Sequence, residues 1–140
     1  MAANTTPIFS ATPAIGLSDA TPILTANTTT DLTAGTIYLL LTADATDGSY
    51  VDKVIIQSLG TNIATVGRLW INNGATTGTA TNNTQFKDFT LAATTVSQVA
   101  AVGNTEITLG FALPATYRIY MTLGTSVAAG FKSTVVAGNY

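Results

Sequence analysis

The feature that most constrains this sequence is the alternation of apolar and polar residues over short segments that end at Gly, Asn or Pro. In EITLGFAL, Ile107, Leu109 and Phe111 alternate with polar or small residues, and TYRIYMTL repeats the pattern. A two-residue period puts one side of a segment in a core and the other toward solvent, as in a half-buried β-strand. Because Thr, Val and Ile are abundant and Gly recurs as punctuation, the chain is predicted to be all-β.

Seven or eight strands are predicted. The clearest are residues 106–113 and 116–123, which are joined by a short connection at Pro114 and are expected to form a hairpin. The other predicted strands are residues 35–43, 50–59, 64–74, 84–92 and 131–138, with 20–27 as a weaker candidate. This number of strands is typical of an antiparallel β-sandwich or jelly roll.

The chain has 140 residues, enough for one hydrophobic core, so residues 16–140 are predicted to form a single β-sandwich domain. Residues 1–15 carry two Pro residues among Thr and Ala, and they are predicted to form an extended N-terminal arm. Residues 72–83 are predicted to be a polar loop, too long for a tight hairpin. Residues 91–103 leave two alternatives open, an irregular connection or one to two helical turns.

Charge is scarce along the whole chain. Charged residues make up 9% of it and the net charge is -2, whereas ordinary globular proteins have about 25% charged residues. The basic residues are scattered singly, so nucleic acid is not expected as a partner. The longest apolar run, Ile37 to Leu41, is far shorter than a membrane-spanning helix, and the first residues lack the features of a secretory signal. Neither a membrane nor export is therefore expected.

Side chains that carry chemistry are also few. The chain has no Cys and no His, which removes thiolate chemistry and the commonest general base and metal ligand. No phosphate-binding or nucleophile motif occurs, so no enzymatic activity and no cofactor are expected. Asp44, Asp47 and Asp52 lie close in sequence, and two interpretations stay open for them, a calcium loop or a solvated turn at Asp47-Gly48.

The single Trp, Trp70, lies between Arg68 and Asn72, which would share its face of a strand. Three interpretations of Trp70 stay open. It is a core side chain of the sandwich, part of a protein interface, or a platform for carbohydrate with guanidinium and amide partners.

The small number of charges predicts that the chain does not act alone. Twelve charged side chains would be spread thinly over the roughly 6,800 Å² that a compact monomer of this mass exposes. Exposed apolar patches and uncharged strand edges usually mark contact surfaces, so association with further copies and with a larger scaffold is expected. Partner contacts are predicted in the N-terminal arm, at the Trp and in the C-terminal strand, at Thr5, Pro7, Ile8, Phe9, Trp70, Val135, Val136 and Tyr140.

Two stretches carry a resemblance to a known family. LPATYRIYMTLGTSVAAGFKSTVVAGNY resembles the C-terminal portion of small phage virion proteins, and GRLWINNG, after VIIQSLGTNIAT, resembles their middle section. Over residues 35–140 the chain is similar to the capsid decoration, or cement, proteins of tailed bacteriophages. The resemblance implies a homotrimer without catalytic residues, whose N-terminal arms reach neighbouring subunits.

What the resemblance implies about function is a structural role in the virion. The protein would be made in the host cytoplasm, bind the outside of the assembled head and stabilise contacts between subunits of the phage major capsid protein. Phage tail and fibre proteins share this composition. A tail or fibre-associated β module that binds host-surface glycan through Trp70 therefore stays open as the alternative.

Overall fold

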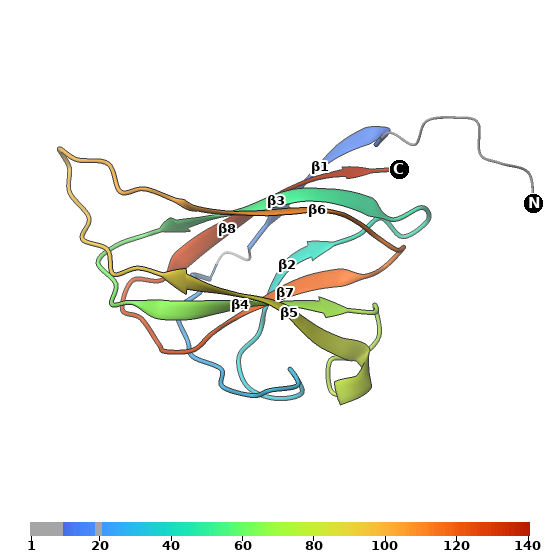
Figure 1. Ribbon diagram of the computed structural model, residues 1–140, viewed down its shortest axis with the longest axis horizontal. Coiled ribbons are helices and arrows are strands. Elements are labelled where there is room, and N and C mark those ends of the chain that lie inside the picture. Colours follow the sequence, from blue (N-terminus) through green and yellow to red (C-terminus); the bar gives the residue numbers. More distant parts are fainter. Residues whose placement is uncertain (1–9, 19–20) are drawn as a thin grey trace, which may run out of the picture.

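The computed structural model describes residues 10–18 and 21–140 and consists of two antiparallel four-stranded sheets packed face to face (Figure 1). In chain order the elements are β1 (Thr12–Leu17), β2 (Tyr38–Thr42), β3 (Ser49–Ser58), β4 (Thr65–Asn72), the 3₁₀ turn η1 (Ala80–Asn82), β5 (Asn83–Leu91), β6 (Thr105–Leu113), β7 (Arg118–Leu123) and β8 (Phe131–Asn139). The predicted β-sandwich is confirmed, with eight strands. Within these residues no helix has the length and apolar character needed to cross a bilayer.

The strand pairing is that of one long hairpin wrapped into a jelly roll. β1 pairs with β8, β2 with β7, β3 with β6 and β4 with β5, each pair antiparallel. Wrapping places β8 against β3 and β7 against β4, which gives the sheet orders β1-β8-β3-β6 and β2-β7-β4-β5. Because consecutive strands mostly lie in different sheets, most connections cross from one sheet to the other, as in a jelly roll.

The predicted hairpin between residues 106–113 and 116–123 is wrong. β6 belongs to one sheet and β7 to the other, so the turn at Pro114 carries the chain across the sandwich. Tyr117 N–H donates to Pro114 C=O over 3.2 Å in this turn, and Thr116 has a φ of 68°. Alternation shows which residues face a core but not which sheet carries them. Two strands that face one core from opposite sheets therefore give the same pattern as a hairpin.

Three further sequence predictions, on two connections and on the N-terminal arm, can be compared with the structure. The predicted polar loop, residues 72–83, connects β4 to β5, and these two strands pair antiparallel on either side of it, a pairing that was not predicted. Residues 92–104 form an irregular connection without helical turns. The predicted boundary of the arm at residue 15 falls inside β1, which pairs with β8 from Thr12 onward. Pro13 is compatible with this strand because β1 lies at the edge of its sheet.

The core lies between the two sheets. Its residues face inward from both sheets, and each of the central strands β3, β4, β7 and β8 contributes at least one of them. The members that are at most 2% exposed in these four strands are Val51, Val54, Ile56, Leu69, Ile119, Met121, Leu123, Phe131 and Val135. All of them are apolar, so the core is held by hydrophobic burial and close packing.

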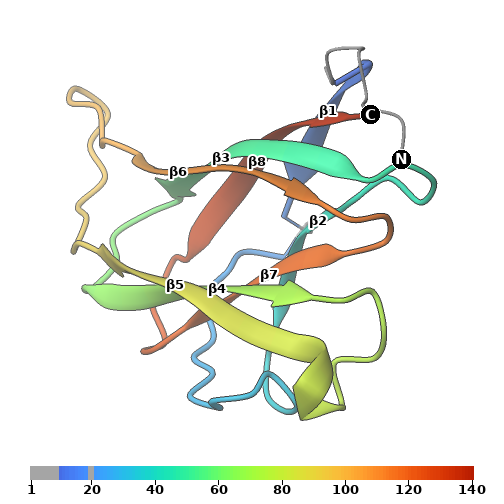
Figure 2. The ribbon, with the colours of Figure 1, turned by 45° about the vertical axis from the view of Figure 1, so that its right-hand side comes forward.

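A third layer covers the outer face of the β2-β7-β4-β5 sheet. The segment 28–37, drawn in blue to cyan at the bottom of Figure 2, carries Leu32, which is 1% exposed and packs with Trp70 and Tyr120. The segment is tied down by Asn27, whose Nδ2 donates to the C=O groups of Ala34 (2.8 Å) and Thr36 (3.0 Å). As a result β7 is buried on both faces, although it lies in a two-layer sandwich.

Candidate interaction surface

One end of the jelly roll is formed largely by connections that carry no charged residue. Three connections meet there, β3–β4 (residues 59–64), β5–β6 (92–104) and β7–β8 (124–130), and Figure 1 shows them together at the left, away from the C-terminus. None of the three contains a charged residue, and each uncharged stretch extends into the flanking strands. The charged residues that bound these stretches are Lys53 and Arg68, Asp88 and Glu106, and Arg118 and Lys132. We refer to the three connections as the uncharged end.

Large apolar side chains are exposed on or beside the uncharged end. Leu59 is 46% exposed, Ile63 59% and Val99 96%, and Val66 and Val96 are exposed as well. They make up most of the large apolar side chains that lie open in the part of the chain the structure describes. An apolar concentration of this kind, without a single charge, is typical of a contact surface.

Asn62 joins the three connections of the uncharged end. Its backbone exchanges two hydrogen bonds with Thr94 of the β5–β6 connection, at 3.1 and 2.9 Å. Its side-chain Nδ2 donates to Gly130 C=O, and its Oδ1 accepts from the N–H groups of Ala129 and Gly130 in the β7–β8 connection. Because Asn62 is only 3% exposed, these bonds form away from water and fix the loops relative to one another.

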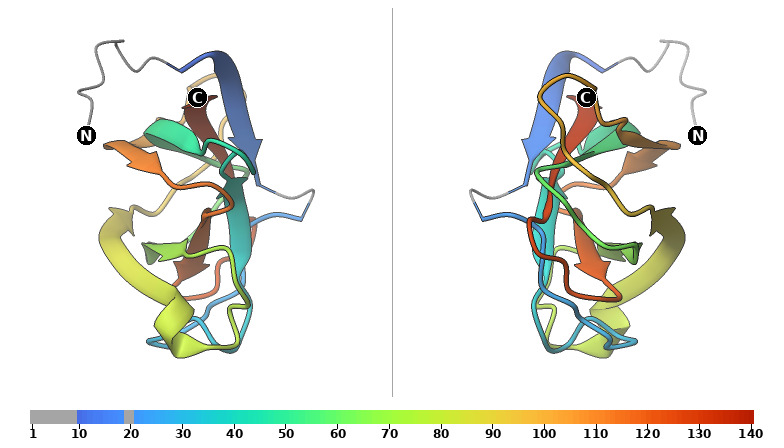
Figure 3. Two further views of the ribbon diagram at one scale, coloured as in Figure 1. Left: turned by 90° about the vertical axis from the view of Figure 1, so that its right-hand side faces the viewer. Right: turned by 90° about the vertical axis from the view of Figure 1, so that its left-hand side faces the viewer.

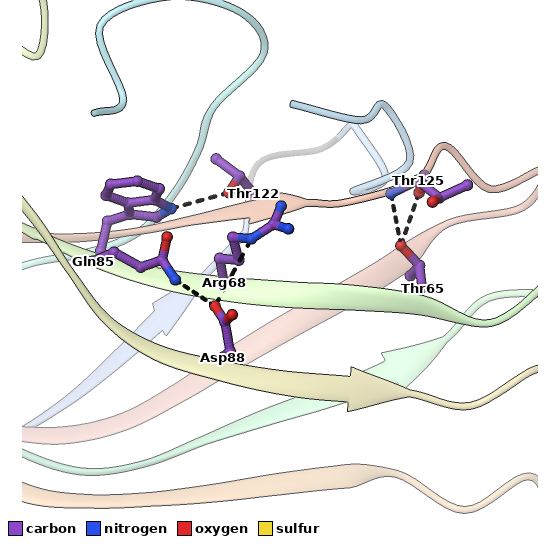
Figure 4. A network of polar contacts seen from close by, with 7 residues as sticks. Thr65, Arg68, Gln85, Asp88, Thr122 and Thr125 are labelled. Atoms are coloured by element: carbon purple, nitrogen blue, oxygen red, sulfur yellow. Dashed lines mark hydrogen bonds and ion pairs between the residues drawn. The ribbon is translucent and has the colours of Figure 1, made fainter. Parts of the chain in front are cut away.

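A second pair of hydrogen bonds between connections lies near Asn62. Thr65 Oγ1 donates to Thr125 C=O over 2.9 Å and accepts from Thr125 N–H over 3.0 Å, as Figure 4 shows. This pair ties the start of β4 to the β7–β8 connection. The uncharged end is therefore preorganised, which lowers the entropic cost of binding a partner.

A small cleft opens at this end. Its volume is about 200 Å³, and its lining includes the buried side chains Ile56, Leu91 and Phe131 together with Thr94 and Asn104. No lining residue is charged. Small-molecule sites usually measure about 300–1,000 Å³, so this cleft suits an apolar side chain of a partner better than a cofactor.

The outer face of the β2-β7-β4-β5 sheet carries a polar network near Trp70 (Figure 4). Arg68 Nε lies 3.8 Å from Asp88 Oδ1, and Gln85 Nε2 donates to the same oxygen. Trp70 Nε1 donates to Thr122 Oγ1 over 3.0 Å. The Asp88 side chain is 55% exposed, so the ion pair fastens β5 to β4 with little gain in stability.

Trp70 is a core residue. It is 1% exposed beneath Leu32, and its neighbour along the strand, Asn72, is fully buried. Of the three interpretations left open by the sequence, burial in the fold is the observed one. The predicted partner contact at Trp70 and the glycan platform built on it are corrected accordingly, since a buried indole cannot stack on a sugar.

The remaining predicted contact residues divide into two groups. Thr5, Pro7, Ile8 and Phe9 lie outside the described residues. In β8, Val135 is fully buried between the sheets and cannot contact a partner, whereas Val136 is half-buried on the outer face and Tyr140 is half-buried after the strand. Tyr140 N–H donates to Gly48 C=O over 3.3 Å, at the end of the molecule opposite the uncharged end.

The Asp-rich turn between β2 and β3 is closed by its own backbone. Asp44 Oδ1 accepts from Asp47 N–H and Thr46 N–H, and these bonds hold the pKa of the Asp44 carboxyl below its ordinary value. In the same way, hydrogen bonds from Thr33 lower the pKa of Asp31 in the covering segment. Such bonds are those of a solvated turn, the second of the two interpretations. Across the described residues no group of three or more metal-ligating side chains gathers.

The residues of the uncharged end were missed by sequence reasoning. The signal was present, because three long gaps between charged residues can be counted along the chain. What could not be seen is that the gaps fall on connections of one end, since this depends on the wrapping of the hairpin.

Comparison with known proteins finds no match for this chain. No family model, no curated protein and no solved structure matches the chain. The topology and the uncharged end therefore carry the functional argument.

Proposed function

We propose that this chain is a structural virion protein, a capsid decoration protein that binds the outside of the assembled phage head and stabilises contacts between major capsid protein subunits. The observation that carries the proposal is the uncharged end, where three fastened connections present Leu59, Ile63 and Val99 to solvent. This end docks on the capsid, and the chain acts by adding contact area rather than by chemistry.

The docking energy comes from apolar burial. Fully covering an exposed Val, Leu or Ile side chain contributes about 1.5–3 kcal/mol. Leu59 and Ile63 are 46% and 59% exposed and contribute about half of this each, so several such side chains together offset the loss of motional freedom on binding. Because the loops are already fixed by Asn62 and Thr65, little further ordering is needed. Binding to the assembled lattice and not to free subunits stabilises the shell by mass action.

The fold supports this role by analogy. Double-sheet jelly rolls build viral capsid proteins, and they also occur in lectins and cupins. Topology alone does not assign function. The absence of an accessible Trp platform removes the feature on which the glycan-binding alternative depended.

The sparse charge supports association with further copies as well as with the capsid. Twelve charged side chains share an accessible surface of 7413 Å². A standard interface covers about 800 Å² of each partner, so two different contacts would hide a substantial part of the uncharged surface. The family resemblance implies a homotrimer for the contact between copies.

The test is cosedimentation of the purified chain with DNA-filled heads of the phage that encodes it, stripped of their own copies. We expect the unmodified chain to sediment with heads, and Val99→Asp and Ile63→Asp to lose at least about tenfold in affinity, equal to about 1.4 kcal/mol each. Both side chains are exposed, so the fold tolerates the changes. Ala75→Asp, in the polar loop at the other end, is the matched control and should bind normally. Failure of the unmodified chain to bind heads would overturn the proposed function.

A further inference from the structure

The sandwich has four edge strands, and charge protects only two of them. β5 carries Lys87 and Asp88, and β6 carries Glu106, whereas β1 and β2 carry no charged residue. β2 is almost entirely buried, but β1 exposes Ile15 (57%) and Leu17 (68%). Charges on an edge strand prevent it from pairing with another chain. β1 is therefore the open edge, and Figure 3 shows it at the rim of the molecule.

The pairing with β8 determines which backbone N–H and C=O groups of β1 point outward at this edge. Ser18 N–H donates to Ser133 C=O over 3.1 Å, and Leu17 lies opposite Thr134 in the β1–β8 ladder. In an antiparallel ladder the N–H and C=O groups of alternate residues point to the same side. Those of Gly16 therefore point toward β8, and those of Ile15 and Leu17 point outward. Among the described residues no strand pairs with this outer side.

We propose that β1 pairs with β1 of a second copy, antiparallel, around a two-fold axis at Gly16. In this register Ile15 of each copy lies opposite Leu17 of the other, and about four backbone hydrogen bonds form. A register centred on Ile15 would place Pro13, which has no N–H to donate, opposite Leu17, and a register centred on Leu17 would place Ile15 opposite residue 19, outside β1. The two β1-β8-β3-β6 sheets become one eight-stranded sheet across the dimer.

The side chains of β1 fit this self-pairing. Ile15 and Leu17 lie on the outer face of the sheet with Val136 and Ile55, as the register shows. Pairing brings both copies of Ile15 and Leu17 together over the axis and covers them. An isologous contact places the same patch on both sides, and an uncharged strand meets its copy without repulsion.

β1 is also held in place for such pairing. Gly16 faces Leu40 of β2 so closely that a Cβ atom there would lie 2.4 Å from the Leu40 carbonyl oxygen. The ladder to β8 extends over the whole strand, from Thr12 to Leu17. A fixed edge pairs at a lower entropic cost than a mobile one.

This inference differs from the trimer that the family resemblance implies, and it concerns the free protein rather than the head. Sedimentation velocity over a series of concentrations measures the mass in solution. We expect a dimer for the unmodified chain and a monomer for Leu17→Lys, which places a charge on the open edge. Leu59→Lys is the matched control, since it makes the same change at the uncharged end, and it should remain a dimer.

A second measurement fixes the register and does not depend on Leu17→Lys. The chain has no Cys, so chains carrying Ile15→Cys can be mixed with chains carrying Leu17→Cys under mild oxidation. Directly opposite residues of a ladder lie within reach of a disulfide, so the mixed disulfide should form faster than in a mixture of Ile15→Cys with Leu59→Cys. A trimer, a monomer at all concentrations, or equal rates in the two mixtures would overturn the proposal. Because no heads are present, these outcomes are separate from failure of the docking function.

Discussion

Asn62 shows how a single amide organises a surface that otherwise lacks strong interactions. It is 3% exposed, and its side chain bonds to Ser58 and to the backbone of Ala129 and Gly130. The bond to Ser58 is local, whereas the bonds to Ala129 and Gly130 join segments almost seventy residues apart in sequence. An Asn in a loop looks like an ordinary turn residue in the sequence, and only the tertiary structure shows that it is buried.

Replacing Asn62 by Ala should therefore destabilise the fold strongly. We expect the free energy of unfolding to fall by about 2–4 kcal/mol, because buried N–H and C=O groups lose their partners. Chemical denaturation followed by the fluorescence of Trp70 measures it. Asn73→Ala is the control, since Asn73 is exposed and bonds within the polar loop, and its cost should stay below about 1 kcal/mol. Equal losses in the two variants would contradict the role assigned to Asn62.

At the level of elements, much of the fold follows from local pattern. The two-residue period of Ile107, Leu109 and Phe111 predicts a strand, and β6 is one. The pairing does not follow, because the residues that decide it lie in other segments. The same limit applies to Trp70, whose covering residue Leu32 lies almost forty positions earlier in the chain. The gaps in charge could be counted from the sequence, but their meeting at one end depends on topology.

The segment 28–37 should shield the indole of Trp70 from water, mainly through Leu32. In Leu32→Ala we expect a red-shifted Trp emission and faster quenching by acrylamide, because the indole loses its apolar neighbour. Loss of a buried Leu side chain also lowers stability, by about 2–5 kcal/mol. Leu59→Ala, at the uncharged end, should leave the emission unchanged. A blue or unchanged emission in Leu32→Ala would show that Leu32 does not shield the Trp.

For the molecule as a whole, the distribution of charge sets the response to salt. A contact made by the uncharged end contains no charged residue of this chain, so salt has little to screen. We expect the affinity for heads to change less than about threefold between about 0.05 and 0.5 M NaCl. Val99→Lys is the control and should introduce a salt dependence on a charged capsid surface. A steep dependence of the unmodified chain would place charged groups in the contact.

The position of Tyr140 has a practical consequence. Its N–H bonds to Gly48 in the β2–β3 connection, and Figure 1 places the C-terminus across the molecule from the uncharged end. A passenger domain fused after this residue would project away from the docking side. If the uncharged end attaches the chain to the head, as we propose, such a fusion would present its cargo outward without obstructing attachment.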